Sequence, residues 1–227
     1  MSSFESANPA WQQFWQAILE APLPDVSPPV PQPVAFDDEF DFLADAPALA
    51  PAANVPAVLT LDPARVSRLA SLEALLPDVV AVLRASPNAL RDDARLDRVD
   101  PAGAIWILRA LQQLPPTALP EHGPLVRLLQ RSARSTDPQL VVLTADVTLQ
   151  LDARAVQLDL VARLHADPQG LGHDGVDRVL ACLKQIADGR CVREMEALLM
   201  DRGAQLSDVH AWQARHIVQV IRRGGRK

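Results

Sequence analysis

The chain has 227 residues, of which 48% are hydrophobic and 22% are charged, and its formal net charge is −6. This length allows one sizeable domain with a tail, or two small domains. The two cysteines are too few for a disulfide framework, and no apolar run approaches the roughly 20 residues that span a bilayer. The N-terminus also lacks the basic and apolar regions of a signal peptide. The sequence therefore predicts a cytoplasmic protein with no membrane span.

Charge and composition differ between the first 60 residues and the rest of the chain. Residues 1–60 contain no Lys or Arg and carry eight acidic residues, whereas residues 61–227 hold all 22 basic residues and 20 acidic ones. This is a clear asymmetry of charge. Most of the basic residues are Arg, which we attribute mainly to codon composition. We predict an acidic, Pro-rich and largely disordered arm over residues 1–60 and a folded domain over residues 61–227.

A short amphipathic helix is predicted over residues 8–21 of the arm. Asn8 can serve as its N-cap, and Pro9 suits the first helical position. Large apolar side chains recur at helical spacing on one face of this helix; they are Trp11, Phe14, Trp15, Ile18 and Leu19. The pattern favours docking of this face on the chain's own domain. The alternative is that the helix binds in a groove of another protein.

Residues 22–60 are rich in Pro, which favours extended backbone over a compact fold. Within them, acidic residues are interleaved with large apolar side chains, which are Phe36, Phe40, Phe42 and Leu43. Such a composition suits a short motif that folds on binding. Three interpretations stay open for this segment: a plain solvated tether, a motif that binds a partner protein, and a motif that docks on the chain's own basic surface.

Four Asp-Pro dipeptides recur at similar intervals in residues 61–227. They begin at Asp62, Asp100, Asp137 and Asp167, and they are 38, 37 and 30 residues apart. Asp is a favourable N-cap and Pro suits the first helical position, so each dipeptide predicts the start of a helix. A period between about 20 and 50 residues is the signature of a solenoid.

Helical patterns fill the intervals between these dipeptides, and Ala and Leu, which are strong helix formers, are abundant. The predicted helices are 63–76, a new turn from 77, a short helix from 87, then 101–114, 122–134, 138–150, 153–165 capped by Asp152, 174–187, 190–202 and a last helix from 207. The segment 138–150 contains β-branched residues that would suit a strand, but its position within the period favours a helix. The predicted fold class is therefore all-α.

The recurring Asp-Pro dipeptides resemble those of HEAT repeats, the helix-pair units of the armadillo-like superfamily. In that family Asp-Pro often opens the first helix of a unit, with Val and Arg a few residues later. Asp62-Pro-Ala-Arg-Val66 follows this pattern, and Asp188-Gly-Arg-Cys-Val-Arg193 follows it more loosely. The resemblance covers residues 62–223 and implies a HEAT-like α-solenoid, and long faces of such stacks bind other macromolecules. An irregular helical bundle is the alternative.

No motif typical of catalysis or nucleotide binding occurs, and we predict a non-enzymatic protein without a cofactor. One loop offers four possible metal ligands, which are His165, Asp167, His173 and Asp174. The pattern favours helix caps and exposed imidazoles, so no metal site is predicted. Cys182 and Cys191 have no C-x-x-C spacing and are interpreted as small buried hydrophobes, with a redox pair as the alternative.

A basic surface is predicted at the C-terminus, formed by Arg215, Arg222, Arg223, Arg226 and Lys227. It is interpreted mainly as a solvated helix end, with contact to an acidic partner or to nucleic-acid phosphates as alternatives. The predicted function is a protein–protein interaction scaffold or adaptor. Its helical stack would bind one partner, and its arm would bind another or regulate the groove of the stack. The alternative is a nucleic-acid-associated helical-repeat protein that uses its Arg-bearing C-terminal helix.

Overall fold

The computed structural model describes residues 8–19, 63–86, 89–91, 93–116 and 122–224, without the side chains of residues 63–70. Over these residues the chain forms helices and turns and no strand. The all-α fold class is therefore confirmed for the described part of the chain. The segment 138–150, whose β-branched residues left a strand conceivable, is a helix.

Except for the end of α2 and the start of α6, the principal helices begin and end close to the predicted positions. They are α1 (Pro9–Leu19), α2 (Pro63–Ala85), α3 (Pro101–Gln112), α4 (Pro124–Ala133), α5 (Pro138–Gln150), α6 (Gln157–Ala166), α7 (Gly172–Ile186), α8 (Val192–Arg202) and α9 (Asp208–Arg222). Short 3-10 helices lie between or before them. These are η2 (Ala94–Arg98), η3 (Arg154–Val156), η4 (Gln169–Leu171), η5 (Gly189–Cys191) and η6 (Gly203–Gln205).

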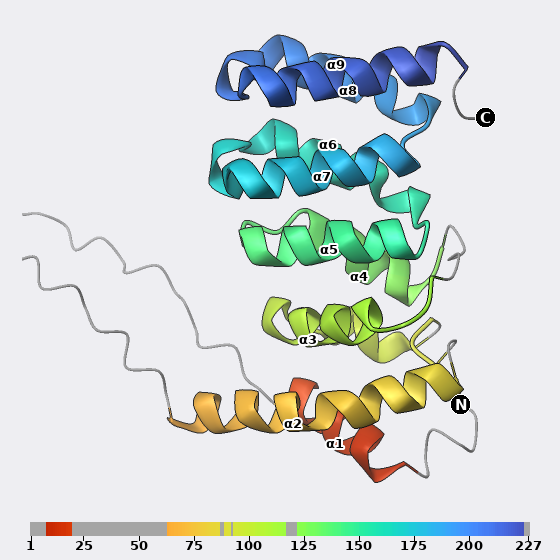
Figure 1. Cartoon of the computed structure of the whole chain (residues 1–227). Coiled ribbons are helices and arrows are strands. Elements are labelled where there is room, and N and C mark those ends of the chain that lie inside the picture. Colours follow the sequence, from red (N-terminus) through yellow and green to blue (C-terminus); the bar gives the residue numbers. More distant parts are fainter. Residues whose placement is uncertain (1–7, 20–62, 87–88, 92, 117–121, 225–227) are drawn as a thin grey trace, which may run out of the picture.

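The helices stack in chain order along one direction (Figure 1). One row consists of α2, α3, α5, α7 and α9, and each of these helices packs on the next. A second row beside it consists of η2, α4, α6 and α8. The rows are joined within each layer, because α4 packs on α5, α6 on α7 and α8 on α9. Within these two rows, neighbours in space are therefore near neighbours in sequence.

Buried apolar side chains from α1 through α9 form one continuous cluster. It is built mainly from Leu, Val, Ala and Ile, as expected for a chain with no Tyr and few other aromatic residues. Fully buried Leu83, Leu108, Leu129 and Leu160 mark its course along the stack. Each helix buries one face against its neighbours, and this burial is the main stabilising term.

Two of the Asp-Pro dipeptides cap helices as predicted. The Asp100 carboxylate accepts a hydrogen bond from the Gly103 N–H at 2.6 Å at the start of α3. The Asp137 carboxylate accepts one from the Gln139 N–H at 2.9 Å at the start of α5. In both cases an orphan donor of the first turn is satisfied. Asp62 lies outside the described residues.

The predicted caps Asp167 and Asp152 have other roles. Asp167 follows α6, and its carboxylate accepts a hydrogen bond at 2.8 Å from the N–H of Gly170, which lies within η4. Asp152 has a positive φ of 43° and forms an ion pair with Arg154 at 3.2 Å, while α6 begins only after η3. The cap prediction is therefore wrong at Asp152, whereas Asp167 makes the same i+3 bond as Asp100 but in a 3-10 helix that precedes α7. A carboxylate can close a turn as readily as it starts a helix.

Pro77 does not start a new helix, contrary to the sequence prediction. It lies inside α2, which is continuous over Pro63–Ala85. Proline removes the backbone N–H that would bond to the carbonyl of Glu73. Both residues are exposed, so water can hydrate that carbonyl. The buried side chains Leu72 and Val79 on either side of Pro77 keep one helical face packed on the core.

Arginine side chains link successive helices of the second row. Each donates to backbone carbonyl groups at or just beyond the end of the preceding helix of that row, where acceptors are otherwise unpaired. The pairs are Arg131 to Leu96 and Asp97, both at 2.7 Å, Arg163 to Ser135 at 2.8 Å, and Arg202 to His165 at 3.1 Å. These arginines therefore have a structural function, which the attribution of Arg to codon composition overlooked.

Helix α1 packs on α2 and α3 although more than 40 residues separate it from α2. Its buried side chains are Trp11, Phe14, Trp15 and Ile18. The Arg95 guanidinium lies 4.3 Å from the Trp15 ring centroid, a cation–π contact with the η2 region. The structure thus follows the predicted docking of this helix on its own domain. The predicted boundary at residues 60 and 61 lies outside the described residues.

Candidate interaction surface

A groove runs along the surface between α7 and α9. Two cavities of about 420 and 350 Å³ lie in it. Both are lined by Ala181 and Lys184 of α7 and by His216 and Ile217 of α9, so they are two parts of one groove. Ala181 is exposed, and its short side chain leaves the space that longer side chains fill elsewhere on α7. Buried Ile217 makes the floor apolar.

Trp212 is the largest side chain at the rim of this groove. It is 62% exposed and lines the 350 Å³ cavity. Its ring stacks on His216, with ring centroids 5.4 Å apart and an interplanar angle of 8°. Val220, one turn further along α9, lines the other cavity and is partly exposed. The groove therefore offers an aromatic platform next to apolar surface, the combination that dominates binding energy at protein interfaces.

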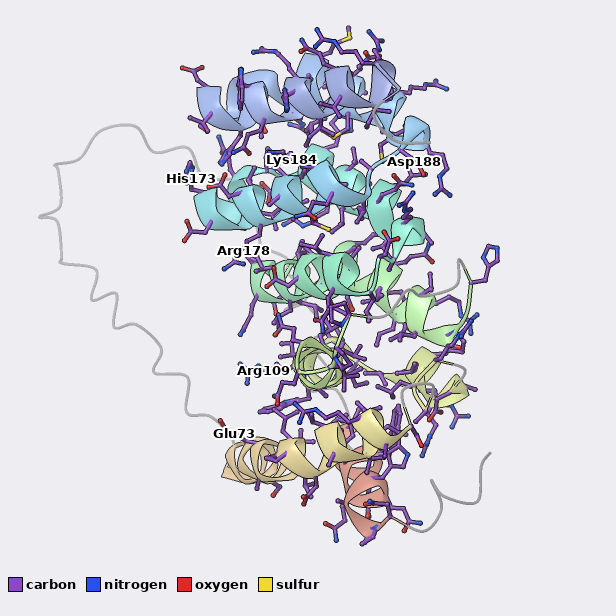
Figure 2. The ribbon with its side chains drawn as sticks, turned by 45° about the vertical axis from the view of Figure 1, so that its right-hand side comes forward. Glu73, Arg109, His173, Arg178, Lys184 and Asp188 are labelled. Carbon is purple, nitrogen blue, oxygen red and sulfur yellow. The ribbon has the colours of Figure 1, made fainter. Side chains whose placement is uncertain are left out.

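Basic side chains line the α7 side of the groove. Arg178 and Lys184 lie along α7 between His173 at one end of the helix and Asp188 beyond the other (Figure 2). Arg178 extends toward α5, where its guanidinium is 3.5 Å from the Asp146 carboxylate. Lys184 is exposed and lines both cavities. These two cations offer positive charge to a segment that carries carboxylates, beside Asp177, which lines the 350 Å³ cavity, and Asp146, the partner of Arg178.

The predicted partner-binding residues of α1 are not at the surface. Trp11, Phe14, Trp15 and Ile18 are almost fully buried in the core. They are unavailable to a partner while α1 stays docked, so their role in binding another protein stays a prediction that requires α1 to undock. The other members of that set lie outside the described residues; they are Phe36, Phe40, Phe42 and Leu43.

The predicted basic C-terminal surface is only partly described. Arg215 and Arg223 are exposed. Arg222 forms an ion pair with Glu196 of α8, which offsets its charge. The last two members, Arg226 and Lys227, lie outside the described residues. The described part of this surface is therefore less basic than the sequence alone indicates.

The four metal-ligand candidates of the sequence are not brought together. His165 lies 3.0 Å from a carboxylate of α8, Asp167 closes its own turn, and Asp174 is exposed in the first turn of α7. His173 instead lies near Asp177 on α7 and near His210 on α9. Sequence spacing could not reveal this cluster, because His210 lies on another helix that only the packing of α9 on α7 brings close.

Both cysteine side chains are buried, as predicted. Burial raises the pKa of the Cys182 thiol to about 12, and it raises that of Cys191 likewise to about 12. The Cys191 Sγ donates a hydrogen bond to the Gln157 Oε1 at 3.0 Å. Both groups are therefore thiols at neutral pH and lack the nucleophilic thiolate form.

Across the described residues, no helix combines the length and the apolar character required to cross a membrane. Comparison of the chain with protein-family models, with curated proteins and with solved structures found no significant match. The resemblance to HEAT repeats therefore stays a prediction. The case for a function rests on the groove and its side chains.

Proposed function

We propose that the protein is a non-enzymatic interaction scaffold whose α7–α9 groove binds a segment of another protein. The observation that carries this proposal is the 62% exposed Trp212 beside an apolar groove floor. Trp is enriched at the centres of protein interfaces, where burial of its ring supplies much of the binding energy. In the free protein most of this ring remains in water.

We further propose that the helical stack is a HEAT-like solenoid. Three features support this: the two rows of helices follow chain order, layers repeat along the stack, and an Arg of the second row recurrently reaches back to the preceding helix. In such an array each unit buries its apolar face on its neighbours and leaves long faces open. The α7–α9 groove lies on one of these faces.

The chemistry of the groove favours a partner segment with large apolar side chains and carboxylates. An apolar anchor would cover Trp212 and Ile217, and carboxylates would lie near Arg178 and Lys184. Such charge complementarity contributes mainly to the association rate and to specificity. The arm of this chain has the same composition at residues 36–43. We infer that the arm regulates the groove by competing with the partner for it.

The alternative, nucleic-acid binding through the C-terminal helix, has weaker support. Phosphate binding requires a concentration of unpaired cations. Arg222 is already paired with Glu196, and the chain as a whole has a net charge of −6. Retention on DNA with a steep salt dependence, abolished by reversing Arg215 and Arg223 to Glu, would favour this alternative.

The proposal is tested by affinity capture with the full chain, read by quantitative mass spectrometry. Trp212→Ala removes the aromatic platform and is expected to reduce capture of the specific partner at least 10-fold, because hot-spot side chains contribute about 2 kcal/mol or more. Met200→Ala is the matched control, since Met200 is 85% exposed on α8 and does not line the groove. Equal loss in both variants, or in neither, contradicts the proposed site.

The regulatory role of the arm needs a variant that leaves α1 in place. Deleting residues 1–60 would remove α1 and its four core side chains. A change in capture could then result from lower stability rather than from loss of the arm. Replacing Phe36, Phe40 and Phe42 by Ser avoids this problem. Increased capture by this variant is expected if the arm occupies the groove, and unchanged capture contradicts competition.

A further inference from the structure

A small cluster of imidazole and carboxylate groups joins the N-terminal ends of α7 and α9. His173 Nε2 lies 3.5 Å from Asp177 Oδ2, and His210 Nε2 lies 3.2 Å from Asp177 Oδ1. The two imidazole rings face each other, with centroids 4.3 Å apart and an interplanar angle of 36°. One ligand atom from each of the three residues lies within 4.8 Å of the other two.

His210 supplies an independent observation that this cluster accommodates a ligand. Its side chain is only 4% exposed, and its Nε2 has no hydrogen-bond partner among the described residues. Asp177 Oδ1 lies 3.2 Å from this nitrogen, within ion-pair distance, but the pair does not have the geometry of a hydrogen bond. A buried ring nitrogen without a partner is unfavourable. An imidazole nitrogen that has no hydrogen-bond partner still has a lone pair that can coordinate a metal ion.

We propose that His173, Asp177 and His210 form a binding site for a divalent transition-metal ion, with Zn²⁺ the best match. Neutral imidazole nitrogens together with one carboxylate oxygen are ligands that Zn²⁺ accepts at about 2.0–2.2 Å. Tetrahedral ligands at that radius are about 3.3 Å apart. The 3.2 Å from His210 Nε2 to Asp177 Oδ1 already suits the ion, whereas the 3.5 Å from His173 Nε2 runs to the other oxygen, Oδ2. With one ligand atom from each residue the set lies within 4.8 Å, so the ligands must close in on the ion.

The remaining adjustment falls on an exposed side chain. The His173 side chain is 64% exposed at the start of α7, so its ring can rotate toward the other two ligands at little cost. His210 is fixed, because its ring is buried and its backbone N–H donates to the Ser207 cap of α9 at 3.2 Å. The site thus combines one anchored ligand with two adjustable ones. Water can fill a fourth position on the open side.

Neighbouring charges also favour a cation at this place. The N-terminal ends of α7 and α9 carry the positive ends of helix dipoles, which by themselves disfavour a cation. Asp174 and Asp208 lie in the first turns of these two helices and oppose that field. Asp177 adds a third carboxylate as a direct ligand. The bound ion would then link the two helices that form the walls of the groove, whether or not the groove binds a partner.

The test uses the full chain, freed of any affinity tag and of metal, and titrates it with Zn²⁺ by calorimetry and with Co²⁺ by visible absorption. One equivalent is expected to bind, and the Co²⁺ spectrum should be that of a site with nitrogen and oxygen ligands only. Thiolate bands are not expected, because Cys182 and Cys191 are buried thiols. Zn²⁺ should also raise the melting temperature, since an ion that binds only the native state stabilises it.

Variants at the exposed ligands keep the test independent of folding. His173→Ala and Asp177→Asn are each expected to weaken Zn²⁺ binding at least about 10-fold, the lower end of the loss seen even for outer-shell partners of metal ligands. His165→Ala is the matched control, because His165 forms another exposed His–Asp pair, at 3.0 Å from Asp201, without a third ligand among the described residues. Absence of Zn²⁺ binding by the wild-type chain overturns the proposal. Binding that His165→Ala abolishes, or that His173→Ala leaves unchanged, overturns it equally.

Discussion

Single aspartates show how far a local signal can predict this structure. Asp-Pro at residues 100 and 137 starts a helix, as its capping chemistry predicts. The same dipeptide at residue 167 follows α6 and precedes the 3-10 helix η4: the Asp167 carboxylate accepts from Gly170, and its carbonyl accepts from Arg163. Residue identity therefore fixes which hydrogen bonds an aspartate can make. Which of these bonds forms depends on side chains that sequence distance does not reveal.

Asp188 gives a prediction at the scale of one residue. Hydrogen bonding and ion pairing with Arg190 lower the pKa of its carboxyl from the ordinary 3.8 to about 2. The ionised form therefore stabilises the fold above pH 4, and this contribution is lost as the pH falls from about 4 toward 2. Asp188→Asn should lower the free energy of unfolding by about 1 kcal/mol at pH 7, a value that allows for solvent screening of the half-exposed Arg190.

Urea unfolding at pH 7, 4 and 3, followed by circular dichroism, measures this effect. The difference between wild type and Asp188→Asn should shrink at pH 3, because below pH 3.8 the unfolded chain binds a proton at Asp188 while the folded carboxyl, with its pKa of about 2, stays ionised. Asp152→Asn is the matched control, since the Asp152–Arg154 pair has the same spacing but is more exposed on its aspartate side. A difference that is the same at every pH would contradict the assigned role of the Asp188 charge.

At the scale of elements, α5 shows how packing overrides local propensity. Its β-branched residues would suit a strand, yet the segment is a helix that packs on α3, α4 and α7. Thr144 fits this helix because its hydroxyl donates to the Leu140 carbonyl at 2.7 Å. Its place within the Asp-Pro period predicted this helix correctly. The spacing of the Asp-Pro dipeptides was thus more informative about this helix than the composition of the segment.

Helix α1 shows what periodicity cannot decide. The sequence pattern of four large apolar side chains on one helical face is the same for a helix that docks on its own chain and for one that binds a partner. The structure buries all four on α2 and α3. The indole N–H groups of Trp11 and Trp15 are buried without a hydrogen-bond partner among the described residues, at about 1–3 kcal/mol each. Burial of each large apolar side chain contributes about 1.5–3 kcal/mol, so on this comparison four such side chains outweigh two unpaired donors.

The close approach of α1 to α3 is tested at Gly103. A Cβ atom at this position would lie 2.7 Å from Ile18 Cγ2, too close for a normal contact. Gly103→Ala should therefore destabilise the protein by about 1–2 kcal/mol, because overpacking costs about 1–3 kcal/mol and exceeds the gain in helix propensity of up to about 1 kcal/mol. In an Ile18→Ala background the same change should be neutral or stabilising.

Urea unfolding of the wild type, both single variants and the double variant gives a double-mutant cycle for Gly103 and Ile18. A coupling of at least about 1 kcal/mol between Gly103 and Ile18 is expected for side chains in direct contact. The Ile18→Ala variant alone should lose about 2–4 kcal/mol through the cavity it leaves. Additive effects of the two substitutions would mean that α1 does not pack on α3 in solution.

At the scale of the whole molecule, the all-helical fold class followed from the sequence, and the groove did not. Regular helix starts and an aliphatic composition predicted an all-helical domain. The groove forms where the short side chain of Ala181 on α7 lies next to His216 and Ile217 on α9. No spacing in the sequence indicates that these residues lie together. Trp212 was visible in the sequence, but a tryptophan on an amphipathic helix is as often core as surface. Its exposure became evident only from the packing of α9.

The central claim, that the α7–α9 groove is the surface that binds a partner, is tested most directly by hydroxyl-radical footprinting of the full chain with and without its captured partner. In the free protein both Trp212 and Met200 are exposed and should be oxidised. With the partner bound, oxidation of Trp212 and of the adjacent His216 should fall several-fold while that of Met200 stays unchanged. Protection of Met200 with Trp212 still oxidised, or no protection of either, would contradict the claim.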